Sequence, residues 1–130
     1  MNYRILYVDS PTFEGREEFA KRLGTTFRLP VDSVSSIEEF AAHLRQRKYA
    51  LIVTSDSMLF QDKVVQGWST LVKFLAKTRP DDLTRFVLVS NRAAIIEEAA
   101  LAQVQAFPKG RDFDKFTDYA RAVIETVTSP

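Results

Sequence analysis

Short apolar runs alternate with longer segments of helical spacing along this chain. The most apolar run is residues 50–54, where five apolar or β-branched side chains lie between a charged segment and Ser55. This pattern predicts a strand buried on both faces, as the central strands of parallel sheets are. Four further strands are expected at residues 4–8, 27–34, 86–89 and 104–107. Pro30 interrupts the second of them, which places that strand at the sheet edge.

The segments between the first strands have helical spacing. A helix is expected over residues 11–23, with Ser10 as its cap and Gly24 at its end. The clearest helix follows a capping box of Ser35 or Ser36 with Glu38 or Glu39, and its apolar face consists of Ile37, Phe40, Ala41 and Leu44. His43 lies off that face, so we expect it in solvent.

Three more helices are expected in the second half of the chain. The first ends before Pro80, a short alanine-rich helix covers residues 93–101, and the last is capped by Asp112. The apolar stripe of the first consists of Val64, Trp68, Leu71, Val72 and Leu75, which assigns the tryptophan to the core. The stripe of the last consists of Phe113, Phe116, Ala120, Val123, Ile124 and Val127.

Strands that alternate with helices predict an α/β fold in which one doubly wound parallel sheet carries helices on both faces. With five strands, the order 2-1-3-4-5 is expected, over a single domain of residues 1–130. In this flavodoxin-like order, the carboxyl ends of the strands meet at one edge, where such folds place their ligands. The polar side chains brought to that edge are Asp9, Ser10, Ser55, Asp56, Ser90 and Lys109.

Composition narrows the function classes. The chain has 130 residues, 18 basic and 17 acidic side chains and a net charge of +1, which gives no electrostatic reason to expect nucleic acid or a membrane as a partner. It contains no cysteine, which excludes disulfides and thiolate metal sites. No apolar run approaches the length of a signal peptide core or a membrane span, so we expect a cytoplasmic location.

Four segments together resemble the receiver domain of two-component response regulators. Residues 4–10 look like the family's first strand, which ends in an acidic pair. Residues 49–58 look like its third strand, where an aspartate accepts phosphate and a methionine commonly follows three residues later. Residues 86–91 match the strand that ends in a switch serine or threonine, and residues 107–109 the strand that carries a lysine. The resemblance covers essentially the whole chain and implies a role in signalling.

The chain departs from that family at the phosphorylation site. The family holds Mg²⁺ with the acidic pair and the phosphoacceptor, but here Asp9 is followed by Ser10. The positions of Tyr49 and Met58 place Ser55 at the phosphoacceptor, and a hydroxyl without a neighbouring base does not replace a carboxylate. A shift of one residue would place Asp56 there instead, on the opposite face of the strand.

Further departures lie near the lysine. Pro108 precedes Lys109, whereas the family's proline follows its lysine, and Ala106 occupies the usual place of the switch aromatic, one residue before Phe107. The segment between Ser55 and Ser90 is long for the family and the next one is short, which predicts an abbreviated helix over residues 93–101.

Each candidate site residue also has a structural interpretation. Asp9 is either a charge partner at the site or the cap of the helix that follows it. Asp56 is either a phosphoacceptor or an acid in a loop or at a helix cap. Ser90 is alternatively a cap for the helix after it. Lys109 is expected to form an ion pair with Asp9 or Asp56, which requires no bound phosphate.

These patterns favour a pseudo-receiver, a non-enzymatic module that binds another signalling protein or a second copy of itself and needs no cofactor. One alternative is a working receiver that accepts phosphate on Asp56 with Mg²⁺ held by Asp9 and Asp56. A second is a flavodoxin-like binder of phosphate or a cofactor, although Gly15 stands alone after the first strand. In the family, the face around the fourth helix pairs with partners, and the candidate interface residues here are Ala93, Ile95, Ile96, Ala100, Leu101 and Phe107.

Overall fold

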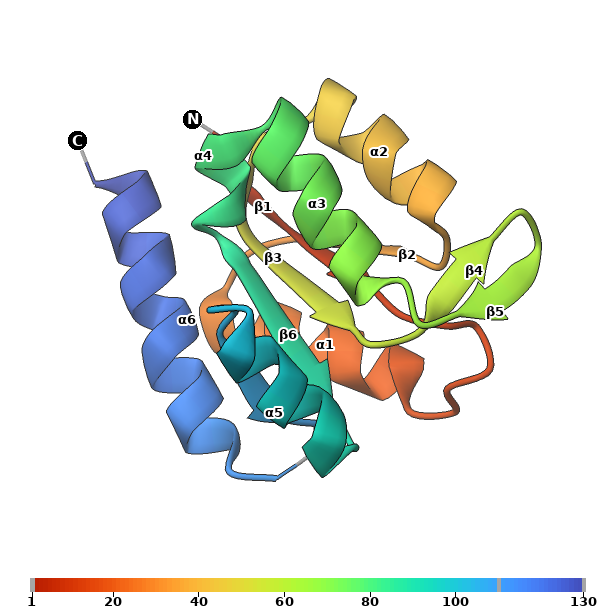
Figure 1. The fold of residues 1–130 in the computed structure, drawn as a ribbon. Helices are drawn as coiled ribbons and strands as arrows, with labels where there is room; N and C mark the ends of the chain where they lie inside the picture. Colours follow the sequence, from red (N-terminus) through yellow and green to blue (C-terminus); the bar gives the residue numbers. More distant parts are fainter. Residues whose placement is uncertain (1, 110, 130) are drawn as a thin grey trace.

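A parallel five-stranded sheet forms the centre of the computed structural model, which describes residues 2–109 and 111–129 (Figure 1). Its strands lie in the order β2-β1-β3-β6-β7, which is the predicted order 2-1-3-4-5 when only the strands of this sheet are counted. The strands are β1 (Arg4–Val8), β2 (Val31–Val34), β3 (Tyr49–Ser55), β6 (Phe86–Ser90) and β7 (Ala106–Pro108). The edge position predicted for the strand near Pro30 is confirmed, but the strand begins only at Val31, after Pro30, because Phe27 is the last residue of α1.

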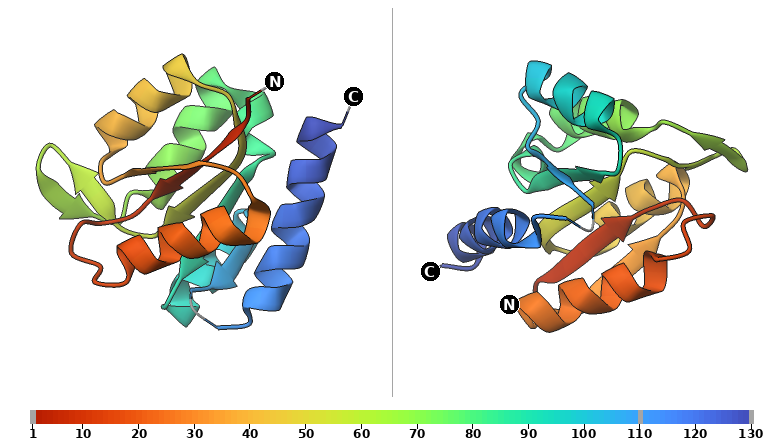
Figure 2. Two further views of the ribbon diagram at one scale, coloured as in Figure 1. Left: turned by 180° about the vertical axis from the view of Figure 1, so that it is seen from behind. Right: turned by 90° about the horizontal axis from the view of Figure 1, so that it is seen from below.

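Helices cover both faces of the sheet (Figures 1 and 2). On one face lie α1 (Arg16–Phe27) and α6 (Phe113–Thr128); on the other lie α2 (Ile37–Gln46), α3 (Trp68–Thr78) and α5 (Ala93–Leu101). A single turn, α4 (Pro80–Leu83), connects α3 to β6.

The alternation of side chains along the strands explains the two layers. Leu6, Ile52 and Leu88 pack toward α2, α3 and α5, whereas their neighbours along each strand pack toward α1 and α6. Every residue of β3 is buried, as its continuous apolar run predicts. Trp68 lies in the core at 6% exposure, as expected.

The predicted start and end of the first helix were wrong. Residues 10–15 form a loop, because the Ser10 carbonyl and hydroxyl accept the Phe13 and Thr12 N–H groups, which gives the backbone a local alternative to a helix. The helix begins only at Arg16, continues through Gly24 and ends at Phe27. Phe19, Leu23 and Phe27 bury one face against the sheet, and this packing outweighs the roughly 1 kcal/mol that a helical glycine costs.

The second helix is confirmed together with its capping box. The Ser36 hydroxyl accepts the Glu39 N–H at 3.1 Å, and the Glu39 carboxylate accepts from the hydroxyls of Ser35 and Ser36. His43 is half-buried rather than fully solvated, with its Nδ1 2.9 Å from the Glu39 carbonyl oxygen.

A β-hairpin after β3 was not predicted. Its strands, β4 (Met58–Phe60) and β5 (Lys63–Val65), pair antiparallel around Gln61 and Asp62, which have φ values of 50° and 65°. Positive φ at both turn residues matches the tight turn preferred in hairpins. Val64 therefore belongs to this hairpin and not to the stripe of α3, and the region after Asp56 is not a helix for that residue to cap.

The ends of the later elements also differ in part from the predictions. The alanine-rich helix is confirmed over Ala93–Leu101, whereas the last strand begins at Ala106, two residues later than expected. Asp112 precedes α6 but makes no side-chain hydrogen bond to it, because its backbone adopts the left-handed conformation with φ of 50°. Its predicted role as a cap was wrong.

Asp32 on β2 accepts hydrogen bonds from Arg4 and Tyr49 at 2.7–2.9 Å. Burial alone would raise the pKa of Asp32, but these bonds and the charges of Arg4 and Arg47 outweigh it and lower that pKa. The resulting stabilisation is present above the ordinary aspartate pKa of about 3.9 and is lost as the pH falls toward the lowered value.

Asp32→Asn is therefore expected to reduce the free energy of unfolding at neutral pH and to reduce its pH dependence below about pH 4. Urea unfolding at several pH values measures both effects. Asp118→Asn, at an exposed position on α6, is the matched control. An unchanged pH dependence in Asp32→Asn would contradict the prediction.

Candidate functional site

The carboxyl ends of four neighbouring strands bring the predicted polar residues together. Asp9 and Ser10 follow β1, Asp56 follows β3, and Lys109 follows β7, while Ser55 and Ser90 are the last residues of β3 and β6. All six are buried. The Lys109 backbone N–H donates to the Ser90 carbonyl at 2.9 Å, which fixes the lysine beside the central strands.

The Lys109 side chain connects the ends of β1 and β3. Its ammonium group lies 2.8 Å from Asp9 Oδ2 and 2.8 Å from Ser55 Oγ. The ion pair expected from the sequence is therefore made with Asp9, while Asp56 does not contact the lysine through any hydrogen bond or ion pair among the described residues.

The Asp9 carboxylate is fully engaged within the protein. The Tyr7 hydroxyl donates to Oδ2 at 2.5 Å, and the Ser10 N–H donates to Oδ1 at 2.8 Å, in addition to the bond from Lys109. Burial raises the pKa of the Tyr7 phenol well above its usual range, and the adjacent negative charge of Asp9 raises it further. Asp9 does not cap α1, which begins only at Arg16.

Ser55 and Asp56 have different partners. The Ser55 hydroxyl accepts from Lys109 and donates to Asp56 Oδ1 at 3.2 Å. The second oxygen of Asp56 lies 3.8 Å from Arg92 Nε. Ser55 thus faces Asp9 and Lys109, whereas Asp56 faces the loop between β6 and α5.

The two remaining serines make local hydrogen bonds. Ser90 Oγ accepts the Arg92 N–H at 3.0 Å at the end of β6, but α5 starts after Arg92 without a side-chain cap, so the predicted role of Ser90 as a cap for that helix was wrong. Ser10 Oγ lies 2.8 Å from the Thr12 hydroxyl and also accepts the Thr12 N–H, within the loop before α1.

Three residues of the site were not identified from the sequence. Phe13 covers the lysine, with the ammonium 4.0 Å from its ring centroid. Tyr7 lies in an apolar strand, so the sequence predicts a core residue there. Arg92 has no distinguishing sequence pattern, and only the fold shows that this exposed cation lies beside Asp56. Of these three residues, only Phe13 could have been suspected from the sequence, as an aromatic residue shortly after Asp9, and this signal is weak.

The residues present do not fit a Mg²⁺ ion. Mg²⁺ requires several oxygen ligands in near-octahedral geometry. Asp9 Oδ2 already accepts from an ammonium and a phenol, and Ser10 offers a hydroxyl where the receiver pattern has a second carboxylate. Within residues 2–109 and 111–129, no group of three or more His, Cys, Asp or Glu side chains gathers as metal ligands do.

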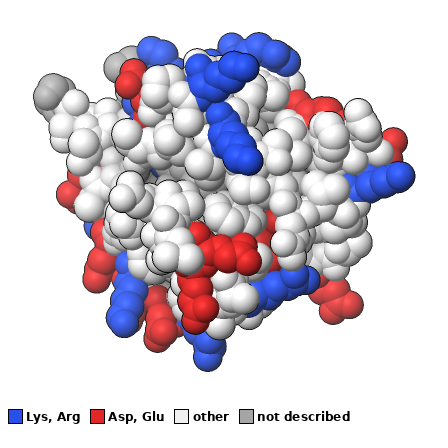
Figure 3. All heavy atoms as spheres, viewed as in Figure 1, with Lys and Arg blue, Asp and Glu red and all other residues white. Residues whose placement is uncertain are grey.

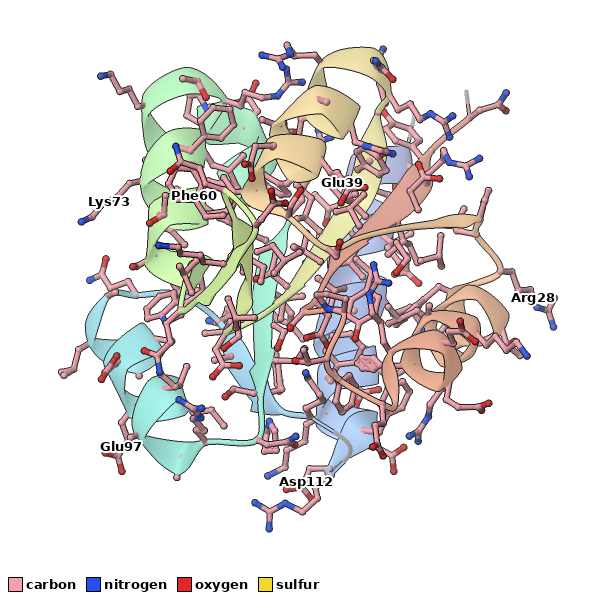
Figure 4. The ribbon with its side chains drawn as sticks, turned by 90° about the vertical axis from the view of Figure 1, so that its right-hand side faces the viewer. Arg28, Glu39, Phe60, Lys73, Glu97 and Asp112 are labelled. Carbon is pink, nitrogen blue, oxygen red and sulfur yellow. The ribbon has the colours of Figure 1, made fainter. Side chains whose placement is uncertain are left out.

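The α5 surface is defined as Ala93, Ile96, Ala100 and Leu101; Ile96 is half-buried, and the other three residues are exposed. Leu101 is 88% exposed, and Figure 4 shows Glu97 of the same helix pointing away from the sheet. Two residues predicted for this interface lie elsewhere. Ile95 is 4% exposed and packs in the core, and Phe107 packs against Phe116 and Tyr119. Neither belongs to the open surface.

Comparison with known proteins identifies the fold. No protein-family model matches the chain, and no curated protein matches its sequence. A response regulator receiver protein from Pseudomonas putida superposes with a TM-score of 0.71 at 18% identity, over 94% of this chain and 98% of that one. The signal receiver domain of an HD domain-containing protein from Pseudomonas fluorescens Pf-5 superposes with a TM-score of 0.70 at 17% identity, over the full length of both chains.

The receiver domain of a Francisella response regulator is similar to the same extent, with a TM-score of 0.69 at 16% identity over 97% of this chain and 99% of that one. These likenesses establish the flavodoxin-like receiver fold predicted from the sequence. Within the described ranges, no helix combines the length and apolar character that crossing a bilayer requires.

Proposed function

We propose that this protein is a pseudo-receiver, a signalling module that acts by binding and does not accept phosphate. The observation that carries the proposal is the position of Lys109, whose ammonium group binds Asp9 and Ser55 at once. In the receiver pattern, the corresponding edge holds an acidic pair and a phosphoaccepting aspartate. Here, serines occupy two of those acidic positions, at residues 10 and 55.

The chemistry of Ser55 supports this proposal. A serine hydroxyl becomes a useful nucleophile only when an adjacent base removes its proton. Lys109 donates a hydrogen bond to the Ser55 oxygen, which withdraws electron density from the atom that would attack phosphorus. The carboxylate next to it, Asp56, accepts from the Ser55 hydroxyl through Oδ1 at 3.2 Å, but its second oxygen lies 3.8 Å from the positive charge of Arg92, which opposes its action as a base.

The charges of the site are balanced without a ligand. Asp9 pairs with Lys109, and Asp56 lies beside Arg92. A phosphoryl group would add roughly two negative charges to a cluster whose cations already have partners. We therefore expect the site to hold the strand ends together rather than to act as a phosphorylation switch.

The α5 surface is the proposed binding face. Its residues are small or apolar, as on surfaces that dock other proteins, and Glu97 and Glu98 of the same helix are the charged residues beside it. The partner would be another signalling protein or a second copy of this chain in the cytoplasm, with neither nucleic acid nor a membrane as the primary target.

An NMR titration with Mg²⁺ and beryllofluoride, a mimic of the acyl phosphate, tests the proposal. No amide shifts are expected near Asp9, Ser55 and Ser90, because neither the ligands of the metal nor a free acceptor carboxylate is available. Asp56→Asn should behave in the same way. Saturable shifts in the wild type that vanish in Asp56→Asn would overturn the proposal and identify a phosphorylation switch at Asp56.

A further inference from the structure

A hollow lies at the opposite edge of the sheet from Asp9 and Lys109. It encloses about 400 Å³ where β1, β3 and β6 begin and where α3 meets α4. Sites for small molecules have volumes of about 300–1,000 Å³, so a compact ligand fits here. Its charged lining consists of four basic residues, Arg47, Lys48, Arg79 and Arg85, and two acidic ones, Asp81 and Asp82.

Contacts within the fold hold two of the guanidinium groups in place. Arg79 Nε donates to Asp82 at 2.5 Å, and Arg85 Nη1 donates to the Tyr49 carbonyl at 2.9 Å and lies 3.7 Å from Asp82. Asp82 is therefore buried between two arginines. Because a guanidinium carries several donors on a rigid plane, these bonds leave other N–H groups for a ligand.

Arg47 is held from the opposite side of the hollow. Its Nη1 lies 3.2 Å from Asp32, which also pairs with Arg4, and 46% of its side chain remains exposed. In Figure 3, Lys and Arg side chains gather at the upper end of the molecule, where α2 and α3 end. The charge of this region is positive even though some of its arginines have partners.

The charge and shape of the hollow indicate the class of ligand. The lining has two more cations than anions, which suits a group with two negative charges. Arginine side chains held by ion pairs present a planar fork that binds phosphate through two hydrogen bonds. Tyr3 also lines the hollow and offers an aromatic surface to an organic substituent.

We infer that this hollow binds the phosphate monoester of a small organic molecule, with Arg47, Arg79 and Arg85 around the phosphate. The site is independent of the cluster around Lys109, because it lies at the amino ends of the strands rather than their carboxyl ends. It would give the protein a small-molecule input separate from the α5 surface.

An NMR titration at about 0.15 M ionic strength tests this inference, since weak surface charge effects are screened there. The probes are inorganic phosphate, glucose 6-phosphate and a phosphoserine peptide. Saturable shifts of the Tyr3, Lys48 and Thr78 amides are expected, with glucose 6-phosphate binding more tightly than inorganic phosphate. Tighter binding of the phosphopeptide would overturn the small-molecule assignment, and an absence of saturable shifts with all three probes would overturn the site.

Three variants make the test specific. Arg47→Gln is expected to weaken binding about tenfold, the effect of losing one charge-assisted contact, while Arg4 still pairs with Asp32. Asp81→Asn, which removes an exposed acid from the lining, is expected to tighten binding. Lys73→Gln is the matched control, because this exposed lysine of α3 points away from the protein (Figure 4) and lies outside the lining. Equal weakening by Lys73→Gln and Arg47→Gln would overturn the inference.

Discussion

Lys109→Met is expected to lower the free energy of unfolding by about 3–5 kcal/mol, the cost of leaving a buried charge without its partner. Asp9 is 1% exposed, and Lys109 supplies its only ion pair among the described residues. The variant also removes the donor to Ser55 and the contact with the Phe13 ring. Urea unfolding, followed through the fluorescence of the buried Trp68, measures the loss.

The control for this prediction is Lys115→Met, at an exposed position on α6, which should change stability by less than about 0.5 kcal/mol. The double variant Asp9→Asn/Lys109→Met should recover part of the loss, because no unpaired carboxylate then remains buried. A Lys109→Met protein as stable as the wild type would contradict the prediction and show that the ion pair does not hold the strand ends together.

The sheet order was predictable because it depends on a few strong patterns. The continuous apolar run of β3 requires burial on both faces, and helices between successive strands require parallel pairing. Once that order is set, the carboxyl ends of β1, β3, β6 and β7 must meet. That order alone brings Asp9, Ser55, Asp56 and Lys109 to one edge of the sheet.

A local hydrogen bond explains the error at the first helix, and an unusual turn explains the missed hairpin. Ser10 binds the backbone of its own loop, so a sequence typical of a helix start forms a turn instead. The hairpin after β3 turns at Gln61 and Asp62, which carry none of the Asn-Gly or Asp-Gly signal of such turns. Its backbone is supported from outside, since the Leu59 N–H donates to the Ser35 carbonyl at 2.8 Å.

The pairing within the site depends on which face each side chain points to, and the sequence left this open. Ser55 shares a sheet face with Tyr7 and Val53, and Lys109 reaches that face, so the lysine meets Ser55 and Asp9. Asp56, one residue later, turns toward Arg92. A change of one residue in register would exchange these roles, and no periodic pattern distinguishes the two cases at the end of a strand.

Restoring the two missing acids is expected to create a metal response that the wild type lacks. Ser10→Asp/Ser55→Asp places a second carboxylate beside Asp9 and a third at the end of β3. Without divalent cations these like charges repel one another and lower the melting temperature. Mg²⁺ at about 100 times its dissociation constant would then add roughly 2.7 kcal/mol to the stability of the variant. The melting temperature in Mg²⁺ and in a chelator measures the difference.

Matched variants separate the metal effect from packing. The side chains introduced in Ser10→Asn/Ser55→Asn have nearly the same size as those of Ser10→Asp/Ser55→Asp but carry no charge. The melting temperature of this control should therefore not depend on Mg²⁺. An equal Mg²⁺ response in the wild type would contradict the proposed loss of phosphorylation chemistry. A response in Ser10→Asp alone would show that Asp56 already supplies the acid at the end of β3, because only that carboxylate and Asp9 would remain to complete the ligand set. The position of the phosphoacceptor would then move from Ser55 to Asp56, and the protein would be one substitution away from a working receiver.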